Sequence, residues 1–297
     1  MQEKGKTVIV VLGPASQDLG RKVAEILKSK IVSVIVKTFP DGESYLRLDG
    51  DVKGEEVVIV QTTGPPQDAN IMQLFLMADV AKDLGAKRVT AVVPYLAYAR
   101  QDKRFLPGEA ISVETFIRLI EASGTNRFLT VNIHKEGILK KFRIPAENLS
   151  AITLLAEHLK KKGLVGAFSL APDEGALELA KEANRVLEGG CGWLRKERDR
   201  LTGEIRVEEK KFDVEGRDVI VFDDIISTGG TIAAAVEILK MQGAKRVYAA
   251  CPHPLLVGEA RRKIMQGGAE EIVGTDCVPS PVSVVSVAPL IAEALGN

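Results

Sequence analysis

The sequence of 297 residues predicts an α/β protein with two similar domains, each a mainly parallel sheet flanked by helices. Three observations predict this class. Short apolar segments rich in Val and Ile recur along the chain, segments of helical period follow them, and one five-residue motif occurs in both halves. Strands that are apolar on both faces and alternate with helices are typical of a parallel sheet covered on both sides. We expect domains of residues 1–145 and 146–297, and we allow for the last helix to pack back on the first domain.

The strand candidates are short, largely apolar and bounded by polar or glycine-containing segments. In chain order they read "TVIVVLG", "VVIVQTT", "RVTAVVPYL", "RFLTVNIH", "AFSLAPD", "DVIVFDDI" and "RVYAACP". One further segment, "KTFPDGESYLRL", has Asp41 and Gly42 between two strand-like runs, and Asp-Gly is a strong signal for a β-hairpin turn. The sequence therefore predicts a hairpin in addition to the parallel strands.

The repeated motif is Gly-Ala-Lys-Arg-Val, at residues 85–89 and 243–247. In both places it ends an amphipathic helix and begins a strand, and Pro94 and Pro252 follow at the same distance. Each copy also has a strand before its helix. Chance is an alternative explanation, because glycine commonly ends helices and Lys-Arg is common in a last helical turn. The matching order of elements favours duplication of one α/β domain.

Composition excludes several classes of protein. Lys plus Arg and Asp plus Glu both number 40, so no net field attracts nucleic acid or a membrane surface, and we expect neither as a partner. The three cysteines form no C-x-x-C pair, which argues against a disulfide framework and a structural zinc site. The N-terminal apolar segment is too short for a membrane span and lacks the features of a signal peptide. These features predict a cytoplasmic protein.

The segment "VIVFDDIISTGGT" at residues 219–231 has the clearest functional signal. In a parallel sheet, ligands bind at the carboxyl ends of strands, and this loop lies between a strand and a helix. Its glycines, hydroxyl side chains and helix N-terminus suit a phosphate group. Paired carboxylates would repel a phosphate, so Asp223 and Asp224 are better placed for hydroxyl groups or Mg²⁺ nearby. The alternative is a turn and helix entry without a ligand, whereas a phosphorylated sugar fits the whole combination.

This loop resembles the phosphoribosyl-diphosphate binding loop that phosphoribosyltransferases and ribose-phosphate diphosphokinases share. The resemblance implies two phosphoribosyltransferase-like domains. It also implies that Asp223 and Asp224 bind the ribose 2- and 3-hydroxyls and that the loop after them binds the 5-phosphate. The phosphate-binding residues would be Ser227, Thr228, Gly229, Gly230 and Thr231. The loop alone does not separate a transferase from a diphosphokinase.

Two segments of the first half resemble the ATP site of ribose-phosphate diphosphokinases, although the chain has neither of the common glycine-rich nucleotide motifs. The hairpin resembles the family's adenine-binding hairpin, in which an aromatic ring stacks on the base and carboxylates accept hydrogen bonds. The segment "ARQDK" resembles its ATP-contacting loop, although composition alone also allows a solvated loop. The implied ATP contacts are Phe39, Asp41, Glu43, Arg100 and Gln101, with Asp102 in support.

Two further residues follow apolar strands and are candidate metal ligands. A lone histidine is more often a packed or surface residue, and an aspartate before a helix is also a good N-cap. The resemblance implies that His134 and Asp173 share one Mg²⁺, with phosphate oxygens and water completing its shell. The chain has Asn132 where many members of the family have Asp, which leaves the role of that position open.

The segment "WLRKERDRLTGEI" holds Arg195, Lys196, Arg198 and Arg200 beside a glycine-rich stretch. A charge run of this kind is most often a mobile solvent loop, and mobility is also what a lid over a triphosphate requires. The Lys-x-Arg spacing resembles the family's flexible catalytic loop. The resemblance implies that Lys196 and Arg198 stabilise the charge that develops on the transferred group.

These motifs occur in the order found in ribose-phosphate diphosphokinases, and the resemblance covers nearly the whole chain. It implies transfer of the β,γ-diphosphoryl group of ATP to the 1-hydroxyl of ribose 5-phosphate, giving 5-phosphoribosyl 1-diphosphate and AMP. It also implies Mg²⁺ as cofactor and a homo-oligomer built on dimers, in which a neighbouring subunit contributes the hairpin to shared active sites. The alternatives are a phosphoribosyltransferase and a catalytically inactive regulatory paralogue. Such a paralogue should have lost metal ligands or the cationic loop, and this sequence keeps both.

Overall fold

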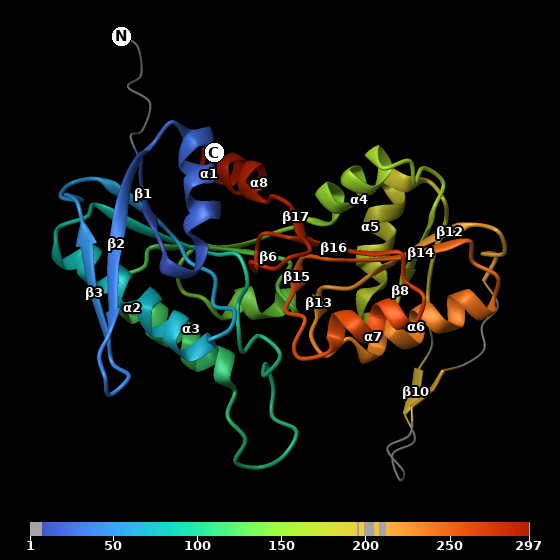
Figure 1. Ribbon diagram of the computed structural model, residues 1–297. Coiled ribbons are helices and arrows are strands. Elements are labelled where there is room, and N and C mark those ends of the chain that lie inside the picture. The colour runs from blue at the N-terminus through green and yellow to red at the C-terminus, as the bar shows by residue number, and fades with distance from the viewer. Residues whose placement is uncertain (1–7, 195, 199–204, 208–211, 297) are drawn as a thin grey trace. The chain divides into compact units, whose positions relative to one another are not determined.

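Figure 1 shows the secondary-structure elements of the computed structural model. The structure describes residues 8–194, 196–198, 205–207 and 212–296. The chain divides into two compact units, which are Met1–Ser150 with Ser286–Asn297 and Ala151–Val285. No helix in the described ranges is long and apolar enough to cross a membrane. Each unit is built around its own main sheet, as the sequence predicts.

The boundary between the units differs from the expected division after residue 145. Strand β7 (Ala146–Leu149) lies beyond that point, yet it pairs with β6 (Arg127–Val131) and so completes the first sheet. The end of the chain also belongs to the first unit. Helix α8 (Ala288–Gly296) packs against α1 (Gln17–Leu27), as Figure 1 shows, and Arg127 Nη2 donates a hydrogen bond of 2.9 Å to the carbonyl of Ala294 in α8.

The first sheet has seven strands in the order β3-β2-β1-β4-β5-β6-β7. Its other strands are β1 (Val8–Leu12), β2 (Lys30–Thr38), β3 (Ser44–Asp49), β4 (Glu56–Val60) and β5 (Arg88–Val93). All neighbours are parallel except β2 and β3, which form the predicted hairpin. The strand order runs outward in both directions from the β1–β4 pair, so this pair is the topological switch point of the sheet.

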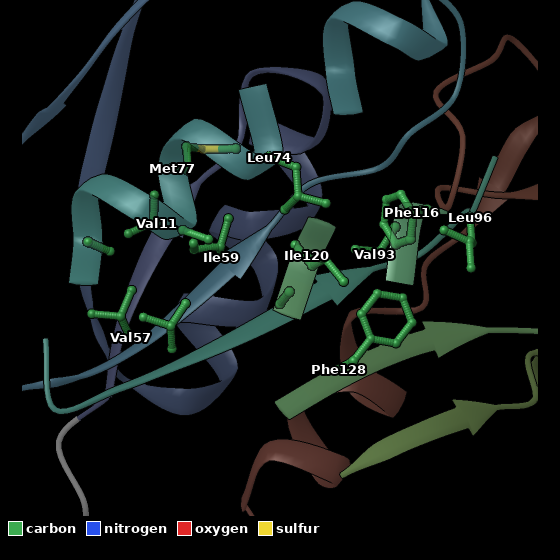
Figure 2. Close-up of a cluster of buried hydrophobic side chains, with 14 of the residues drawn as sticks. Val11, Val57, Ile59, Leu74, Met77, Val93, Leu96, Phe116, Ile120 and Phe128 are labelled. Atoms are coloured by element: carbon green, nitrogen blue, oxygen red, sulfur yellow. The ribbon is translucent and has the colours of Figure 1, made fainter. Parts of the chain in front are cut away.

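Helices α2 (Gln67–Asp83) and α3 (Ser112–Ala122) contribute to the apolar cluster that Figure 2 shows on the first sheet. Alternate strand residues point into this cluster, because the side chains of a strand alternate between its two faces. The buried side chains include Val11, Val57, Ile59 and Val93 of the strands and Leu74, Met77, Phe116 and Ile120 of the helices. Short 3₁₀ turns, Pro14–Ser16 and Glu136–Lys141, complete the described elements of this unit.

The second sheet has six strands in the order β17-β16-β14-β12-β8-β9, all parallel. The strands are β8 (Phe168–Ala171), β9 (Cys191–Trp193), β12 (Asp218–Phe222), β14 (Arg246–Cys251), β16 (Glu271–Thr275) and β17 (Ser283–Val285). The helices are α4 (Ile152–Lys161), α5 (Leu177–Leu187), α6 (Gly230–Met241) and α7 (Ala260–Gln266). Both faces of β12 are buried, because Val219 and Val221 pack with α6 and α7 whereas Ile220 and Phe222 pack with α4 and α5.

Three smaller features of the second unit lie around this sheet. Strands β10 (Lys196–Arg198) and β11 (Ile205–Val207) form an antiparallel pair, and β13 (Ile225–Ile226) pairs in parallel with β15 (His253–Pro254). A 3₁₀ turn, Glu174–Ala176, follows β8. The order of the main sheet runs outward in both directions from the β8–β12 pair, which is therefore its switch point.

The two units repeat the same local structure at the duplicated motif. Gly85 and Gly243 have φ of 85° and 84°, the left-handed conformation that ends a helix. The carbonyl of each accepts a 2.8 Å hydrogen bond from another glycine amide, Gly54 in the first unit and Gly216 in the second. In both sheets the next strand begins with an arginine whose register partner is acidic, which gives the pairs Glu56–Arg88 and Asp218–Arg246. The prediction of two similar domains is confirmed.

Candidate active site

The loop after β12 lies at the carboxyl edge of the second sheet, at its switch point. Gly229 has φ of 77°, and its carbonyl accepts a 2.9 Å hydrogen bond from Ala233 in the first turn of α6. Thr228, Gly230 and Thr231 are exposed, and Ser227 is half-buried. Hydroxyl groups, exposed backbone and the positive end of a helix therefore lie together, and this combination suits an anion such as a phosphate.

A second segment, which no sequence motif predicts, holds this loop in place. The amides of His253, Leu256 and Val257 donate to the carbonyls of Asp224, Ile226 and Ser227 at 3.0–3.1 Å. A β-carbon added to Gly229 would lie 2.9 Å from the carbonyl oxygen of Ala260 and 3.1 Å from its β-carbon. The loop therefore lies against the segment 253–260, and glycine at 229 is required by space as well as by its φ angle.

Three carboxylates gather at this switch point. Asp223 and Asp224 follow β12, and Asp173 follows the neighbouring strand β8. Burial, and then the negative charges of Asp224 and Asp173, raise the pKa of Asp223 well above its ordinary value. The Asp224 amide donates to Asp223 Oδ1 at 2.9 Å, which orients that carboxylate. The structure thus places the Asp173 carboxylate near the paired acids.

Asp173 occupies the N-cap position of the 3₁₀ turn Glu174–Ala176, yet within the described residues its side chain makes no capping hydrogen bond. Its φ of −159° is ordinary extended backbone. The capping explanation therefore has no support in the geometry, and the carboxylate stays available for another role. In the described part of the chain, no group of three or more His, Cys, Asp or Glu side chains is arranged to hold a metal ion.

The switch point of the first sheet is closed by protein hydrogen bonds. Gln61 follows β4 and is fully buried, and its Oε1 accepts from the Ala15 amide at 3.0 Å. Ser16 Oγ accepts from the Thr62 amide at 2.7 Å. A β-carbon at Gly13 would lie only 2.4 Å from Gln61 Oε1, so the two loops are in close contact. Gln61 and Thr62 follow β4 directly, as Asp223 and Asp224 follow β12, so protein hydrogen bonds are made where the second unit has its paired acids.

The predicted hairpin turn is confirmed in its backbone geometry. Phe39 and Glu43 close the turn through a 2.8 Å bond from the Phe39 amide to the Glu43 carbonyl, and Gly42 has φ of 97°. The Phe39 ring is 48% exposed and lies edge-on to Tyr45, with ring centroids 6.3 Å apart. Asp41 Oδ1 accepts from the Glu43 amide at 3.2 Å. An exposed aromatic face and two exposed carboxylates are therefore present at this turn.

The loop after β5 carries the predicted ATP contacts. Arg100 and Gln101 are exposed and Asp102 is half-buried. Gln101 Oε1 accepts a hydrogen bond from Ser112 Oγ at the start of α3, which anchors one side of the loop. Further along, Glu109 accepts from the amides of Phe105 and Leu106 at 2.7 and 3.0 Å. These two bonds lower the pKa of Glu109.

His134 is half-buried, in the loop that follows β6. Asn132, two residues earlier, has φ of 40° and is 6% exposed. Its amide donates to the Leu149 carbonyl at 2.8 Å and its Nδ2 to Ser150 Oγ at 3.4 Å. Asparagine tolerates the left-handed conformation better than most residues, so the structure gives Asn132 a backbone role at this position.

Lys196 and Arg198 lie in strand β10 instead of a loop, which differs from the expectation. Their register partners in β11 are Val207 and Ile205. Arg195 and Arg200, the other two cations of the run, lie outside the described residues. On the side of β9, the amide of buried Leu194 donates to the Ala171 carbonyl at 3.0 Å, so the approach to β10 is attached to the second sheet.

These features define a class of protein, a duplicated α/β chain with an anion loop and paired carboxylates at the switch point of its second sheet. The family model for the N-terminal domain of ribose phosphate pyrophosphokinase matches residues 8–124, and the phosphoribosyl transferase domain model matches residues 145–276. The chain belongs to the ribose-phosphate pyrophosphokinase family. The resemblance seen in the sequence is therefore confirmed.

Similar proteins cover nearly the full length of this chain. The ribose-phosphate pyrophosphokinase of Methanothermobacter thermautotrophicus is 44% identical, over 95% of this chain and 97% of its own. That of Saccharolobus solfataricus is 41% identical, over 91% and 93%. The crystal structure of phosphoribosylpyrophosphate synthetase from Mycobacterium smegmatis has a TM-score of 0.87 and 31% identity, and the match covers 98% of each chain. Both units are thus shared with these relatives.

Proposed function

We propose that this chain is an enzyme that transfers the β,γ-diphosphoryl group of ATP to the 1-hydroxyl of ribose 5-phosphate, giving 5-phosphoribosyl 1-diphosphate and AMP. The names of its full-length relatives support this activity. The observation that carries the proposal is the switch point of the second sheet, where an anion loop lies beside three carboxylates. A phosphorylated sugar has a phosphate for the loop and hydroxyl groups for the acids.

Ribose 5-phosphate is assigned to the second unit. Its phosphate is bound by the loop, through Ser227, Thr228, Gly229, Gly230 and Thr231. Its 2- and 3-hydroxyls donate to Asp223 and Asp224, because a carboxylate accepts hydrogen bonds and does not donate them when ionised. Binding at both ends of the sugar fixes the direction of the 1-hydroxyl, and such alignment is a main contribution to catalysis of phosphoryl transfer.

ATP is assigned to groups of the first unit. The exposed ring of Phe39 stacks on adenine, and the carboxylates of Asp41 and Glu43 accept hydrogen bonds from the base. Arg100 and Gln101 contact the nucleotide from the loop after β5, with Asp102 in support. All of these residues follow strands of one parallel set, so their loops lie at the carboxyl edge of the first sheet.

The residues His134 and Asp173 are proposed as ligands of Mg²⁺. The uncapped carboxylate of Asp173, beside the paired acids, fits this role by its chemistry, because Mg²⁺ prefers oxygen ligands and is usually bound through one or two carboxylates together with substrate phosphates and water. When bound, the ion would neutralise charge on the phosphates of ATP. His134 would supply a nitrogen ligand from the loop after β6.

In the reaction, the oxygen of the 1-hydroxyl forms a bond to the β-phosphorus, and the bond from that phosphorus to the oxygen shared with the α-phosphorus breaks. AMP leaves with this oxygen, and the hydroxyl proton is lost to solvent. We assign to Lys196 and Arg198 the stabilisation of negative charge as it develops on the transferred group. No covalent enzyme intermediate is required.

The other expectations from the sequence are part of this proposal. The enzyme would be a homo-oligomer built on dimers with shared active sites, and it would act in the cytoplasm. A phosphoribosyltransferase would leave the hairpin and the Lys-x-Arg segment at 196–198 without a role. A catalytically inactive paralogue would not be expected to keep Lys196, Arg198, His134 and Asp173 together. No described feature favours either alternative.

The product of the reaction tests the proposed function. Purified protein with ATP, ribose 5-phosphate and Mg²⁺ should form AMP and 5-phosphoribosyl 1-diphosphate in equal amounts, measured by ³¹P NMR or ion-exchange chromatography. Removal of Mg²⁺ with EDTA should abolish turnover, and an excess of Mg²⁺ should restore it. Formation of ADP would contradict the proposal, because ADP results from attack on the γ-phosphorus. Equal activity with a nucleobase and phosphoribosyl diphosphate would favour the transferase instead.

A further inference from the structure

The backbone at Tyr98 is unusual for an aromatic residue. Its φ is 64°, in the left-handed region that a bulky side chain rarely adopts. Such conformations are energetically unfavourable, persist only where surrounding contacts hold them, and gather at functional sites. Tyr98 lies two residues before Arg100. The strained position therefore directs the chain into the loop to which the ATP contacts are assigned.

One side-chain hydrogen bond holds Tyr98 in this position. Its hydroxyl donates to Asp68 Oδ1 at 2.5 Å, and Asp68 lies in the first turn of α2. This bond to a carboxylate raises the pKa of Tyr98, so the phenol remains a donor at neutral pH. A hydrogen bond to a charged group is stronger than one between neutral groups. The two residues are thirty positions apart in the sequence, so the bond joins separate elements.

Backbone bonds on either side of Tyr98 complete the attachment. Thr63 Oγ1 donates to the Tyr95 carbonyl at 2.7 Å and accepts from the Ala97 amide at 2.8 Å. On the other side, the Gln101 amide donates to the Tyr98 carbonyl at 3.0 Å, which closes a turn over residues 98–101. The segment is thus held at 95–97 by the loop after β4 and at Tyr98 by α2, immediately before Arg100 and Gln101.

We propose that Asp68 and Tyr98 are positioning residues, whose hydrogen bond holds the turn 98–101 in the conformation that presents Arg100 and Gln101 to ATP. The proposal rests on the ATP role of this loop stated under the proposed function. Tyr98 is 38% exposed, so its hydroxyl contributes little to the core. Its effect falls on the backbone conformation of the next residues, and therefore on ATP and not on ribose 5-phosphate.

Binding of α,β-methylene-ATP tests the proposal, because this analogue cannot undergo cleavage between the α- and β-phosphates. Tyr98→Phe should raise its Kd about 3- to 10-fold, the range expected for one net hydrogen bond. The KM for ribose 5-phosphate and the Tm should stay near the values of the unmodified enzyme. Asp68→Ala should match Tyr98→Phe, whereas Asp68→Asn should recover part of the affinity, because the amide oxygen still accepts the phenol hydrogen. Asp79→Ala, on the exposed side of the same helix, is the matched control and should leave the Kd unchanged.

A double variant separates a shared bond from two independent effects. If Asp68 and Tyr98 act through one bond, Tyr98→Phe with Asp68→Ala should bind the analogue no more weakly than either single variant. Additive losses would overturn the proposal, as would an unchanged Kd in Tyr98→Phe. Weaker binding of both substrates with a lower Tm would also overturn it, because that result indicates a folding role.

Arg100→Ala and Gln101→Ala serve as reference variants for the ATP role of the loop. If they bind the analogue normally, the ATP role of the loop is wrong; if they lose affinity and Tyr98→Phe does not, the positioning role alone is wrong.

Discussion

Two adjacent glycines in the anion loop differ in what they require of their surroundings. Gly229 has φ of 77°, and an added β-carbon would lie 2.9 Å from the carbonyl oxygen of Ala260. An added β-carbon at Gly230, the first residue of α6, has no atom within 4 Å among the described surroundings. The sequence motif alone does not distinguish them, whereas in the structure glycine is required at 229 and a side chain has space at 230.

Gly229→Ala should therefore lower the free energy of unfolding, and Gly230→Ala should not. A left-handed non-glycine residue costs about 1–2 kcal/mol, and the contact with Ala260 adds to this. Gly230→Ala should be neutral or more stable by about 0.4–1 kcal/mol, because alanine restricts the unfolded chain. Urea unfolding of both variants measures the difference. Equal stability of the two variants would contradict the assigned contact.

Asp223 illustrates how a residue of the proposed site can lower stability. Its folded pKa is raised by burial and by the charges of Asp224 and Asp173. The folded chain then binds a proton more readily than the unfolded chain, so this group makes folding less favourable as pH rises above its ordinary pKa. At neutral pH this group therefore lowers the free energy of unfolding, which is common for residues of functional sites.

Asp223→Asn should raise the Tm in metal-free buffer at pH 7 and weaken ribose 5-phosphate more than ATP. Each kcal/mol added to the free energy of unfolding raises the Tm by about 2–4 °C for a protein of this size class. Asparagine keeps the oxygen that accepts the Asp224 amide. The gain should shrink as pH is lowered toward the ordinary carboxyl pKa, since Asp223 then becomes protonated in the parent protein. Calorimetry at several pH values measures this. If the gain in Tm grew as the pH was lowered, the predicted effect of the Asp223 charge on stability would be wrong.

Several residues of the site could be predicted from the sequence because they lie in one local motif. Asp223, Asp224 and the loop to Thr231 are consecutive, and so is the turn at Asp41 and Gly42. The long-range contacts around the candidate site residues could not be predicted in this way. Ala260 against Gly229, and Asp68 bonded to Tyr98, join residues about thirty positions apart, and no local pattern encodes such a pair.

At the scale of elements, the predicted strands are those buried on both faces. All seven apolar segments occur as β1, β4, β5, β6, β8, β12 and β14. Strands β7, β9 and β17 lie at the sides of the sheets, are only three or four residues long, and include polar or glycine residues. Periodicity over so few residues is too weak to detect. Strand β16 begins with Glu271 and follows Glu270, and these two charged residues obscured it.

The cationic run is another missed strand, because it was expected as a loop. Lys196 and Arg198 belong to β10, paired with β11. The charge of the segment suggested solvent exposure, and the alternation of residue types in Ile205–Val207 was the available signal for a strand.

Lys196→Ala and Arg198→Ala should each lower kcat about 100-fold or more, with much smaller changes in KM. The physical reason is that these cations are assigned to charge that appears only in the transition state. Steady-state kinetics with each substrate varied in turn measures both parameters. Glu197→Ala, between them on the same strand, is the matched control for disruption of β10. A rise in KM with kcat unchanged would place the cations in ground-state binding instead.

At the scale of the whole molecule, the duplication accounts for the division of roles. Both units end a helix with a left-handed glycine, and both pair an acidic residue in register with the arginine of the next strand. Each main sheet also has a switch point. In the second unit the switch point carries the anion loop and acids, whereas in the first unit Gln61, Ser16 and Ala15 close it with hydrogen bonds. The first unit would therefore bind its ligand through surface loops, which is where the proposed ATP contacts lie.

The position of the hairpin bears on assembly. In the first sheet, β1 and β4 separate β2 from β5, so the hairpin turn and the loop at 100–102 leave the sheet three strand spacings apart, or roughly 14 Å at about 4.8 Å per spacing. The Phe39 ring is half exposed at the tip of this hairpin. Under the proposed function, an adenine hairpin of one chain that meets the loop of another, in a closed symmetric dimer, would account for this separation.

Mixing two inactive variants tests whether active sites are shared between chains. One variant carries Phe39→Ala with Glu43→Ala, which removes the proposed adenine contacts, and the other carries Asp223→Asn with Asp224→Asn, which removes the sugar contacts. After subunit exchange, some hybrid sites would combine an intact hairpin from one chain with an intact sugar loop from the other. For a dimer assembled at random, about half of the molecules are hybrids and each gains one intact site, so activity should return to roughly a quarter of the unmodified level. Exchange is verified independently by native mass spectrometry of chains with different mass tags. If hybrids form and activity stays at the level of the separate variants, each site is built within one chain and the shared-site prediction is wrong.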